Sequence, residues 1–275
     1  MAKQPGKKPD PLIALLTDFG THDWFVASMK AVIKNIAPQA ELIDLTHEVI
    51  RQNVMAASFI LESCYRDFPP GTIFCCVVDP GVGTRRRRLA ATNGLYFFIA
   101  PDNGLLTGVE RQSQTFLAHV IENTAYMHIG SGTTFEGRDV FAPAAAYLAS
   151  GIPLQSFGPT CEDIIRLPGI FPQREKENRI ICKVAYIDHF GNLVTNIGPE
   201  LLPETANLRE VNVTINKRTI VGMVEGYESV KKGLLLAYWG STGKMEIALS
   251  HGSAARSLDA TIGTPVILEI TNPSG

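Results

Sequence analysis

Short apolar runs alternate with longer amphipathic stretches over the first 170 residues of the chain. The apolar runs have the length of strands, and the longer stretches repeat their apolar positions every three or four residues, as helices do. Apolar strands with few polar positions are typical of a parallel sheet that helices cover on both faces. We therefore predict strands within 12–18, 41–47, 71–84 and 95–106, and helices within 24–38, 53–69 and 140–151. Asn53 has the side chain of an N-cap for the second helix, and Gly151 is placed to end the third.

The pattern changes after residue 167. Residues 168–179 combine prolines with charges of both signs, which is typical of a linker. Short β-rich runs separated by turns follow, and they indicate a small barrel or sandwich. The predicted organisation is an α/β domain at 10–170 with a mostly parallel, Rossmann-like three-layer sheet, a linker at 171–179, and a smaller all-β, barrel-like domain at 180–275.

Composition narrows the possible partners. The 275 residues are 45% hydrophobic and 19% charged, which is enough apolar material for a folded core. A net charge of -2 argues against a nucleic-acid binder, and no apolar run reaches the roughly 20 residues of a membrane span. The basic N-terminal residues are followed by too short an apolar run for a secretory signal. We expect a soluble, cytoplasmic protein with a short loose leader.

The cysteine pattern points away from metals and disulfides. There are five cysteines and no CxxC pair. Cys75 and Cys76 lie in the apolar run TIFCCVV, where buried thiols act as small hydrophobic side chains. Because no His/Cys cluster has the spacing of metal ligands, we predict no metal site.

Polar side chains follow the predicted strands of the α/β part, at the edge of the sheet where ligands bind in such folds. The four segments are 17–20, 79–84, 101–104 and 134–139. Asp18 and Asp79 each close an apolar strand, where a carboxylate can bind a ribose diol or orient a water molecule. The alternative is that each carboxylate caps a helix or forms a turn. The turn DPGVGT has neither the Walker sequence nor the GxGxxG fingerprint, which disfavours a phosphate or dinucleotide site.

Three further segments contain side chains that suit a binding site, although each can also be explained as an ordinary structural turn. The arginine run 85–88 is either a solvated turn or the source of one inward side chain that pairs with Asp79. Residues 187–196 place an acid, an aromatic ring and amides together, which suits a zwitterion with a flat ring or forms an ordinary β-turn. Residues 238–243 carry hydroxyl groups that suit a ligand or a hairpin turn.

Taken together, the motifs identify a family. In order along the chain they are TDFG, DLTH, VVDPGVGT, APDNGLL, TTFEGRDVFAPAAA, IDHFGNLVTNI and GSTGKMEIA. This series resembles the S-adenosyl-L-methionine (SAM) hydroxide adenosyltransferase family, which is similar to the SAM-dependent fluorinating and chlorinating enzymes. The resemblance extends from about Leu12 to about Ile270. It implies an α/β domain followed by a β-barrel, and a homotrimer whose sites lie between subunits.

The resemblance also implies a reaction. Water or hydroxide attacks C5′ of the ribose of SAM, giving adenosine and L-methionine, so that SAM is the substrate and not a cofactor. The implied catalytic set is Asp79, Arg86 and Glu136, where Glu136 occupies a position at which the hydrolases often carry histidine. Implied substrate contacts are Asp18 to the ribose diol, Asp188 to the methionine ammonium, Phe190 and Asn192 to adenosine, Ser241 to the methionine carboxylate or the adenine edge, and, more loosely, Glu246.

Glu136 raises a specific expectation and keeps alternatives open. If Asp79 and Glu136 share only Arg86, the set is net negative and one carboxyl pKa should rise. The alternatives are a chlorinase-like halogenase and a non-catalytic protein that binds adenosine or SAM. Water is favoured over halide because Asp79 stands where the fluorinating enzymes carry an aromatic residue. A Rossmann-type nucleotide enzyme is disfavoured by the missing glycine fingerprint.

Overall fold

The chain divides into two compact units, residues 1–167 and 168–275. The computed structural model describes residues 10–128, 134–169, 171–203 and 206–271. The expected loose leader at the N-terminus lies largely outside the described residues. Each unit has its own sheet and its own buried core.

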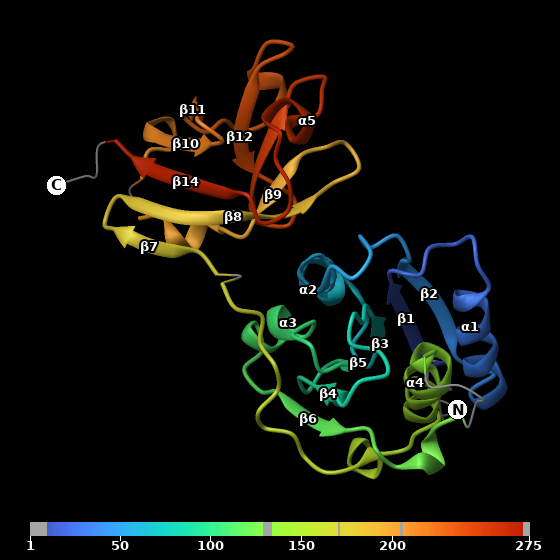
Figure 1. The fold of residues 1–275 in the computed structure, drawn as a ribbon. Coiled ribbons are helices and arrows are strands. Elements are labelled where there is room, and N and C mark those ends of the chain that lie inside the picture. Colours follow the sequence, from blue (N-terminus) through green and yellow to red (C-terminus); the bar gives the residue numbers. More distant parts are fainter. Residues whose placement is uncertain (1–9, 129–133, 170, 204–205, 272–275) are drawn as a thin grey trace, which may run out of the picture. The chain divides into compact units, whose positions relative to one another are not determined.

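A six-stranded mixed sheet forms the centre of the first unit (Figure 1). Its strand order is β2-β1-β3-β5-β4-β6. The pairs β1–β2, β1–β3 and β3–β5 are parallel, whereas β4 is antiparallel to both β5 and β6. The strands are β1 (Leu12–Thr17), β2 (Glu41–Thr46), β3 (Ile73–Val77), β4 (Arg88–Thr92), β5 (Phe97–Pro101) and β6 (Leu117–Val120).

The two antiparallel strands were absent from the sequence prediction. Strand β4 begins at the end of the arginine run, so its charged start conceals the buried residues Leu89, Ala90 and Ala91. Strand β6 is short, with an exposed leucine at one end. The expected mostly parallel sheet is therefore a mixed sheet whose parallel part is β2, β1, β3 and β5.

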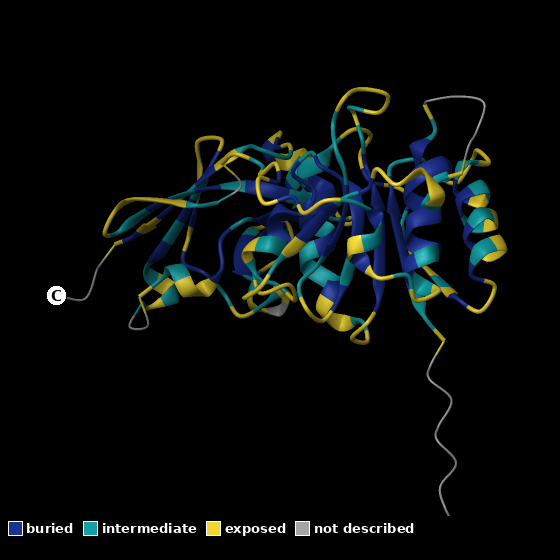
Figure 2. Cartoon of the chain, turned by 90° about the horizontal axis from the view of Figure 1, so that it is seen from below, coloured by how far each residue is buried: buried dark blue, intermediate teal, exposed yellow. Residues whose placement is uncertain are grey.

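Helices lie on both faces of this sheet (Figure 1). On one face, Ile33 of α1 packs in a buried cluster with Leu15 of β1 and Cys75 of β3. On the other face, the Phe74 ring of β3 lies 6.5 Å from that of Tyr65, the residue that follows α2. Buried positions follow the strands and the inward sides of the helices (Figure 2). The helices of this unit are α1 (Phe25–Ile36), α2 (Val54–Cys64), α3 (Thr107–Arg111) and α4 (Ala142–Ala149).

The helix ends confirm the predicted caps. Asn53 Oδ1 accepts a hydrogen bond of 2.9 Å from the amide of Ala56, as an N-cap does. Gly151 has a φ of +93° and donates its amide to the Leu148 carbonyl at 3.0 Å, which ends α4. Helix α2 is shorter than predicted, because a 3₁₀ turn, Tyr65–Asp67, takes over its last residues.

The second unit is built on an antiparallel, barrel-like sheet with strand order β11-β10-β14-β8-β9-β13-β12. Strand β7 (Gln173–Lys176) pairs with β8 inside the segment predicted to be a linker. All four β7 side chains are exposed, so its sequence lacks the alternation that would reveal a strand. Other elements are β8 (Arg179–Ile187), β9 (Leu193–Thr195), β10 (Val211–Ile215), β11 (Arg218–Val221), β12 (Leu235–Trp239), β13 (Met245–Leu249), α5 (Ala254–Leu258) and β14 (Pro265–Ile270).

The cysteines occur as free thiols, and Cys75 and Cys76 are fully buried as predicted. Burial raises the pKa of the Cys75 thiol to about 12. Among the described residues, no group of three or more His, Cys, Asp or Glu side chains is arranged to hold a metal ion. Within the same residues, none of the helices combines the length and apolar character needed to cross a bilayer.

Candidate active site

Asp18 and Asp79 follow the neighbouring parallel strands β1 and β3 and line one pocket. Parallel strands end at the same edge of a sheet, so residues that follow them come together there. Glu136 lines the same pocket from the segment before α4. The pocket has a volume of about 170 Å³, and all of its lining residues belong to the first unit.

One wall of the pocket is aromatic, a feature that sequence analysis missed. The ring centroids of Phe25 and Phe135 lie 5.1 Å apart, and those of Phe19 and Phe25 lie 6.0 Å apart. A Cβ atom at Gly137 would lie 3.1 Å from Cε2 of Phe19, so the glycine lets this ring close against the turn. The pocket is therefore lined both by carboxylates and by flat apolar rings.

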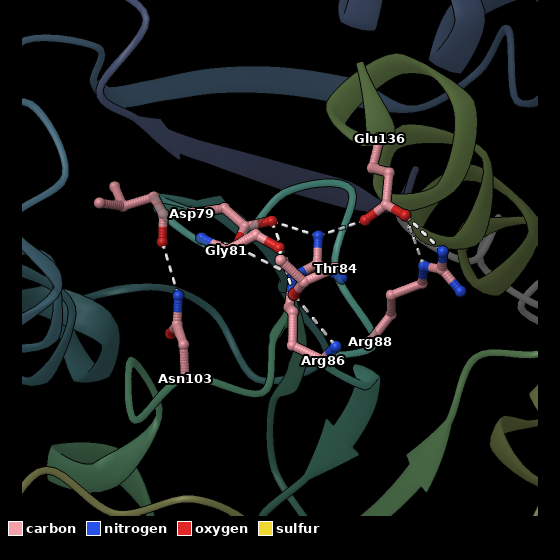
Figure 3. A network of polar contacts seen from close by, with 8 residues as sticks. Asp79, Gly81, Thr84, Arg86, Arg88, Asn103 and Glu136 are labelled. Carbon is pink, nitrogen blue, oxygen red and sulfur yellow. Dashed lines mark hydrogen bonds and ion pairs between the residues drawn. The ribbon is translucent and has the colours of Figure 1, made fainter. Parts of the chain in front are cut away.

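Asp79 and Arg86 form a buried ion pair (Figure 3). Arg86 Nε lies 2.9 Å from Oδ1 and 2.8 Å from Oδ2 of the carboxylate, and Nη2 also contacts Oδ2. The Gly81 amide donates to Oδ1 at 3.2 Å. The Asp79 and Arg86 side chains are 4% and 8% exposed. The predicted pairing of one inward arginine with Asp79 is confirmed.

Glu136 lies between two arginines (Figure 3). Its Oε2 accepts from Arg86 Nη2, and its Oε1 accepts from Arg88 Nε at 2.9 Å and from Arg88 Nη2. The residue precedes a π-helical turn, Gly137–Phe141, an irregularity that is frequent at functional sites.

The pKa of Glu136 is lowered, and the expected rise is wrong for this carboxyl. Burial alone would raise the pKa, but the hydrogen bonds and charges of Arg88 and Arg86 outweigh burial. The expectation failed because it counted a single cation. With Arg88 included, two guanidinium groups balance two carboxylates.

The arginine run divides its side chains between the two sides of an extended segment. Arg86 and Arg88 point toward the acids of the pocket, while Arg87 contacts Asp102 at 2.8 Å and Asp163 at 2.6 Å. This alternation is the period of an extended chain, and it was the available signal for the role of Arg88. Arg85 is exposed.

The segment 101–104 supports the pocket and does not line it. Asn103 Nδ2 donates to the Val78 carbonyl at 2.9 Å and so fixes the backbone next to Asp79. The buried Asp102 accepts from the Ile165 amide at 2.8 Å in addition to its contact with Arg87. Asp18 accepts from the Gln52 amide at 2.7 Å, which ties the pocket to the loop before α2.

The candidates of the second unit gather at two turns. Asp188 accepts from the amides of Phe190 and Asn192 at 2.9 and 2.8 Å, and the Asn192 side chain donates to Asp188 at 2.8 Å. The β-turn interpretation thus describes the backbone of this segment. Phe190 is 75% exposed beside this turn, so its ring is available to a ligand or to another chain.

Ser241 and Glu246 belong to the β12–β13 hairpin. Ser241 is exposed in the turn, whereas Glu246 is 8% exposed and accepts a hydrogen bond from the Tyr238 hydroxyl. Burial, together with hydrogen bonds to Glu246 and Tyr227, raises the pKa of Tyr238. A Cβ atom at Gly240 would lie 1.9 Å from Glu246 Oε1, so the glycine makes room for the buried carboxylate.

Comparison with known proteins relates both units to one family. Residues 13–158 match the N-terminal domain of the SAM hydroxide adenosyltransferases, and residues 182–267 match their C-terminal domain. The chain is 35% identical over 259 residues to an (R)-S-adenosyl-L-methionine hydrolase of Salinispora tropica, covering 93% of this chain and 96% of that protein. It is 30% identical over 214 residues to a fluorinase of Actinoplanes sp., covering 68% of this chain and 72% of the fluorinase.

A solved structure agrees with these matches. A conserved protein from Thermotoga maritima aligns with a TM-score of 0.86 and 38% sequence identity, covering 93% of this chain and 99% of that one. The predicted resemblance is confirmed, and the chain belongs to the SAM hydroxide adenosyltransferase family.

Proposed function

We propose that this protein hydrolyses S-adenosyl-L-methionine to adenosine and L-methionine by attack of water or hydroxide at C5′ of the ribose. The observation that carries the proposal is the pocket in which Asp79, held by Arg86, lies at the edge of the sheet beside Asp18. The family membership and the name of the Salinispora tropica relative give the substrate class.

The proposed chemistry needs no acid for the leaving group, because a sulfonium departs as a neutral thioether. The water oxygen bonds to C5′ while the C5′–S bond breaks and its electron pair moves to sulfur. The water gives up a proton to the Asp79 carboxylate, which then releases it to solvent. Asp79 accepts a hydrogen bond from the attacking water and so directs an oxygen lone pair at C5′, while Arg86 holds the carboxylate in place.

The remaining pocket residues take binding roles in this proposal. Asp18 accepts hydrogen bonds from the ribose diol. The aromatic wall formed by Phe19, Phe25 and Phe135 supplies an apolar surface that limits water around the reacting carbon. Glu136 belongs to the catalytic set through its contact with Arg86.

A halogenase is the main competing function, since a fluorinase is among the relatives. A halide would lie next to the Asp79 carboxylate in a pocket that also holds Asp18, an acid outside the balanced set of Arg88, Glu136, Arg86 and Asp79. Like charges repel strongly where water is scarce, so this lining favours a neutral water nucleophile. A protein that only binds adenosine or SAM is the remaining alternative.

Product analysis tests the proposal. We expect purified protein incubated with SAM to release adenosine and methionine, with no change when chloride is added. Separation by liquid chromatography with mass detection distinguishes the outcomes. A 5′-halo-5′-deoxyadenosine in the chloride sample would establish a halogenase, and unchanged SAM in every sample would contradict both enzymatic functions and leave the binding protein.

The proposal includes a homotrimer in which the α/β domain at 10–170 of one subunit shares a site with the barrel-like domain at 180–275 of another. Two observations support it. The pocket of about 170 Å³ in the first unit is smaller than the roughly 300–1,000 Å³ usual for small-molecule sites. The implied methionine and adenosine contacts, Asp188, Phe190, Asn192, Ser241 and Glu246, all belong to the second unit.

We expect light scattering at micromolar concentration to give three chain masses. A Phe190→Ser variant should keep this mass while its KM for SAM rises, if the ring contacts adenosine. A monomeric mass for the wild-type protein at that concentration would contradict the shared site.

Two finer parts of the proposal concern fold and location. The first sheet is Rossmann-like and three-layered, supported by its parallel strands β2, β1, β3 and β5 with helices on both faces. The protein is cytoplasmic, supported by its five free cysteines, since thiols persist in reducing compartments.

A further inference from the structure

Four charged side chains alternate in a single line, Arg88–Glu136–Arg86–Asp79 (Figure 3). Glu136, Arg86 and Asp79 are buried, with side chains 4% to 8% exposed, and Arg88 is 32% exposed at one end of the line. Each oxygen of Glu136 has its own guanidinium, Oε1 with Arg88 and Oε2 with Arg86. The line is electrically neutral as a whole.

This arrangement determines which carboxylates the nitrogen atoms of Arg86 contact. Its Nε and Nη2 atoms both contact Asp79, and Nη2 is shared with Glu136. If Glu136 had no second cation, its full charge would compete with Asp79 for that nitrogen. Breaking a buried ion network by removing one partner leaves an uncompensated charge, which is far more costly than losing a surface contact.

The fold places Arg88 where it can serve as the second cation of Glu136. Arg88 is the first residue of β4 and points to the same side as Arg86, two positions earlier. Arg87 points away to Asp102 and Asp163. Alternate arginines of the run thus form ion pairs on opposite sides of the segment. The two that point into the pocket, Arg86 and Arg88, pair with the two acids Asp79 and Glu136.

We propose that Arg88 is a positioning residue, which neutralises Glu136 so that Arg86 stays engaged with the catalytic Asp79. The inference rests on the proposed function, because the effect on Asp79 is measured as turnover. It also makes a claim about the pair itself, that Arg88 and Glu136 act as one unit. The loss caused by replacing Arg88 should therefore be smaller when Glu136 has already been replaced by an uncharged residue.

A double-variant cycle tests this claim by steady-state kinetics of adenosine release. We expect Arg88→Met to lower kcat roughly tenfold, within the range of interaction energies measured inside one ion-pair network. In a Glu136→Gln background, the further change Arg88→Met should lower kcat by much less than tenfold, because glutamine carries no charge that competes with Asp79 for Arg86. The matched control is Arg85→Met, which removes an exposed arginine from the same run and should leave kcat and KM unchanged.

A merely structural arginine would behave differently. If Arg88 only anchored β4, the loss in Arg88→Met would persist undiminished when Glu136→Gln is added. That additive result, or a kcat for Arg88→Met equal to that of wild type, would overturn the inference. Wild-type protein that releases no adenosine would instead reject the proposed function, so the two failures are distinct.

A second readout needs no turnover. The charged groups around Glu136 are Arg88, Arg86 and, through Arg86, Asp79, with Asp18 on the same pocket. Carboxyl carbon NMR, with Glu136→Gln to assign the signal, follows the titration of Glu136 in substrate-free protein. We expect its titration midpoint to rise in Arg88→Met relative to wild type. An unmoved midpoint would overturn the inference even if the protein were inactive toward SAM.

Discussion

Replacing Asp79 by alanine is expected to lower the turnover of SAM by a factor of roughly 100 or more, the size of a lost general-base or water-orienting group. The Asp79 carboxylate follows β3, is held by Arg86 and lines the pocket, where its side chain is largely shielded from solvent. Without it, water can still enter, but nothing directs its lone pair at C5′. Initial rates of adenosine release measure the effect, and binding of adenosine by calorimetry should survive in part.

The matched control for Asp79→Ala is an Asp102→Asn variant. Asp102 also follows a strand of the same sheet and pairs with an arginine of the same run, but it does not line the pocket. Its variant should keep most turnover in the fraction that is folded. Turnover by Asp79→Ala at the wild-type rate would eliminate the proposed role of this carboxylate.

Replacing Arg86 by methionine is expected to destabilise the α/β unit by about 3–5 kcal/mol, the usual cost of removing one partner from a buried ion pair. Asp79 would lose all of its contacts with the Arg86 guanidinium, while Glu136 would keep Arg88. Because the Asp79 side chain is only 4% exposed, water can replace only part of the lost contacts. Urea unfolding followed by circular dichroism measures the change.

The sign of the pH dependence provides a check on this stability effect. A buried carboxylate without a cationic partner destabilises the fold only while it is charged. The loss of unfolding free energy in Arg86→Met should therefore shrink as the pH falls and the carboxylate binds a proton. Arg85→Met, which alters an exposed side chain, should remain within about 0.5 kcal/mol of wild type. A deficit for Arg86→Met no larger than that of Arg85→Met would show that the pair does not stabilise the unit.

The sequence pattern was sufficient for the parts of the fold with strong local signals. The apolar strands β1 and β3 and the capped helices α2 and α4 follow from periodicity and from residues such as Asn53 and Gly151. Strands β4 and β7 do not, because one begins with arginine and the other exposes every side chain. Each pairs with the strand that follows it directly along the chain, β5 and β8 respectively, so it is the charged or exposed side chains, and not a distant partner, that conceal these strands.

The candidate site shows the same division. Asp18 and Asp79 could be brought together from sequence, because parallel strands end at a common edge. Arg88 could not be assigned, since its partner Glu136 lies 48 residues away along the chain. The raised carboxyl pKa expected for the set failed at Glu136 for this reason, as one unseen cation reverses the sign.

The central claim, that water attacks C5′ of SAM in this protein, is tested most directly by running the reaction in water enriched in the heavy oxygen isotope. Mass spectrometry then locates the label. The account predicts adenosine that carries the heavy oxygen in its 5′-hydroxyl group, and methionine without it. Adenosine that lacks the label, or a 5′-halogenated nucleoside in its place, would contradict the account.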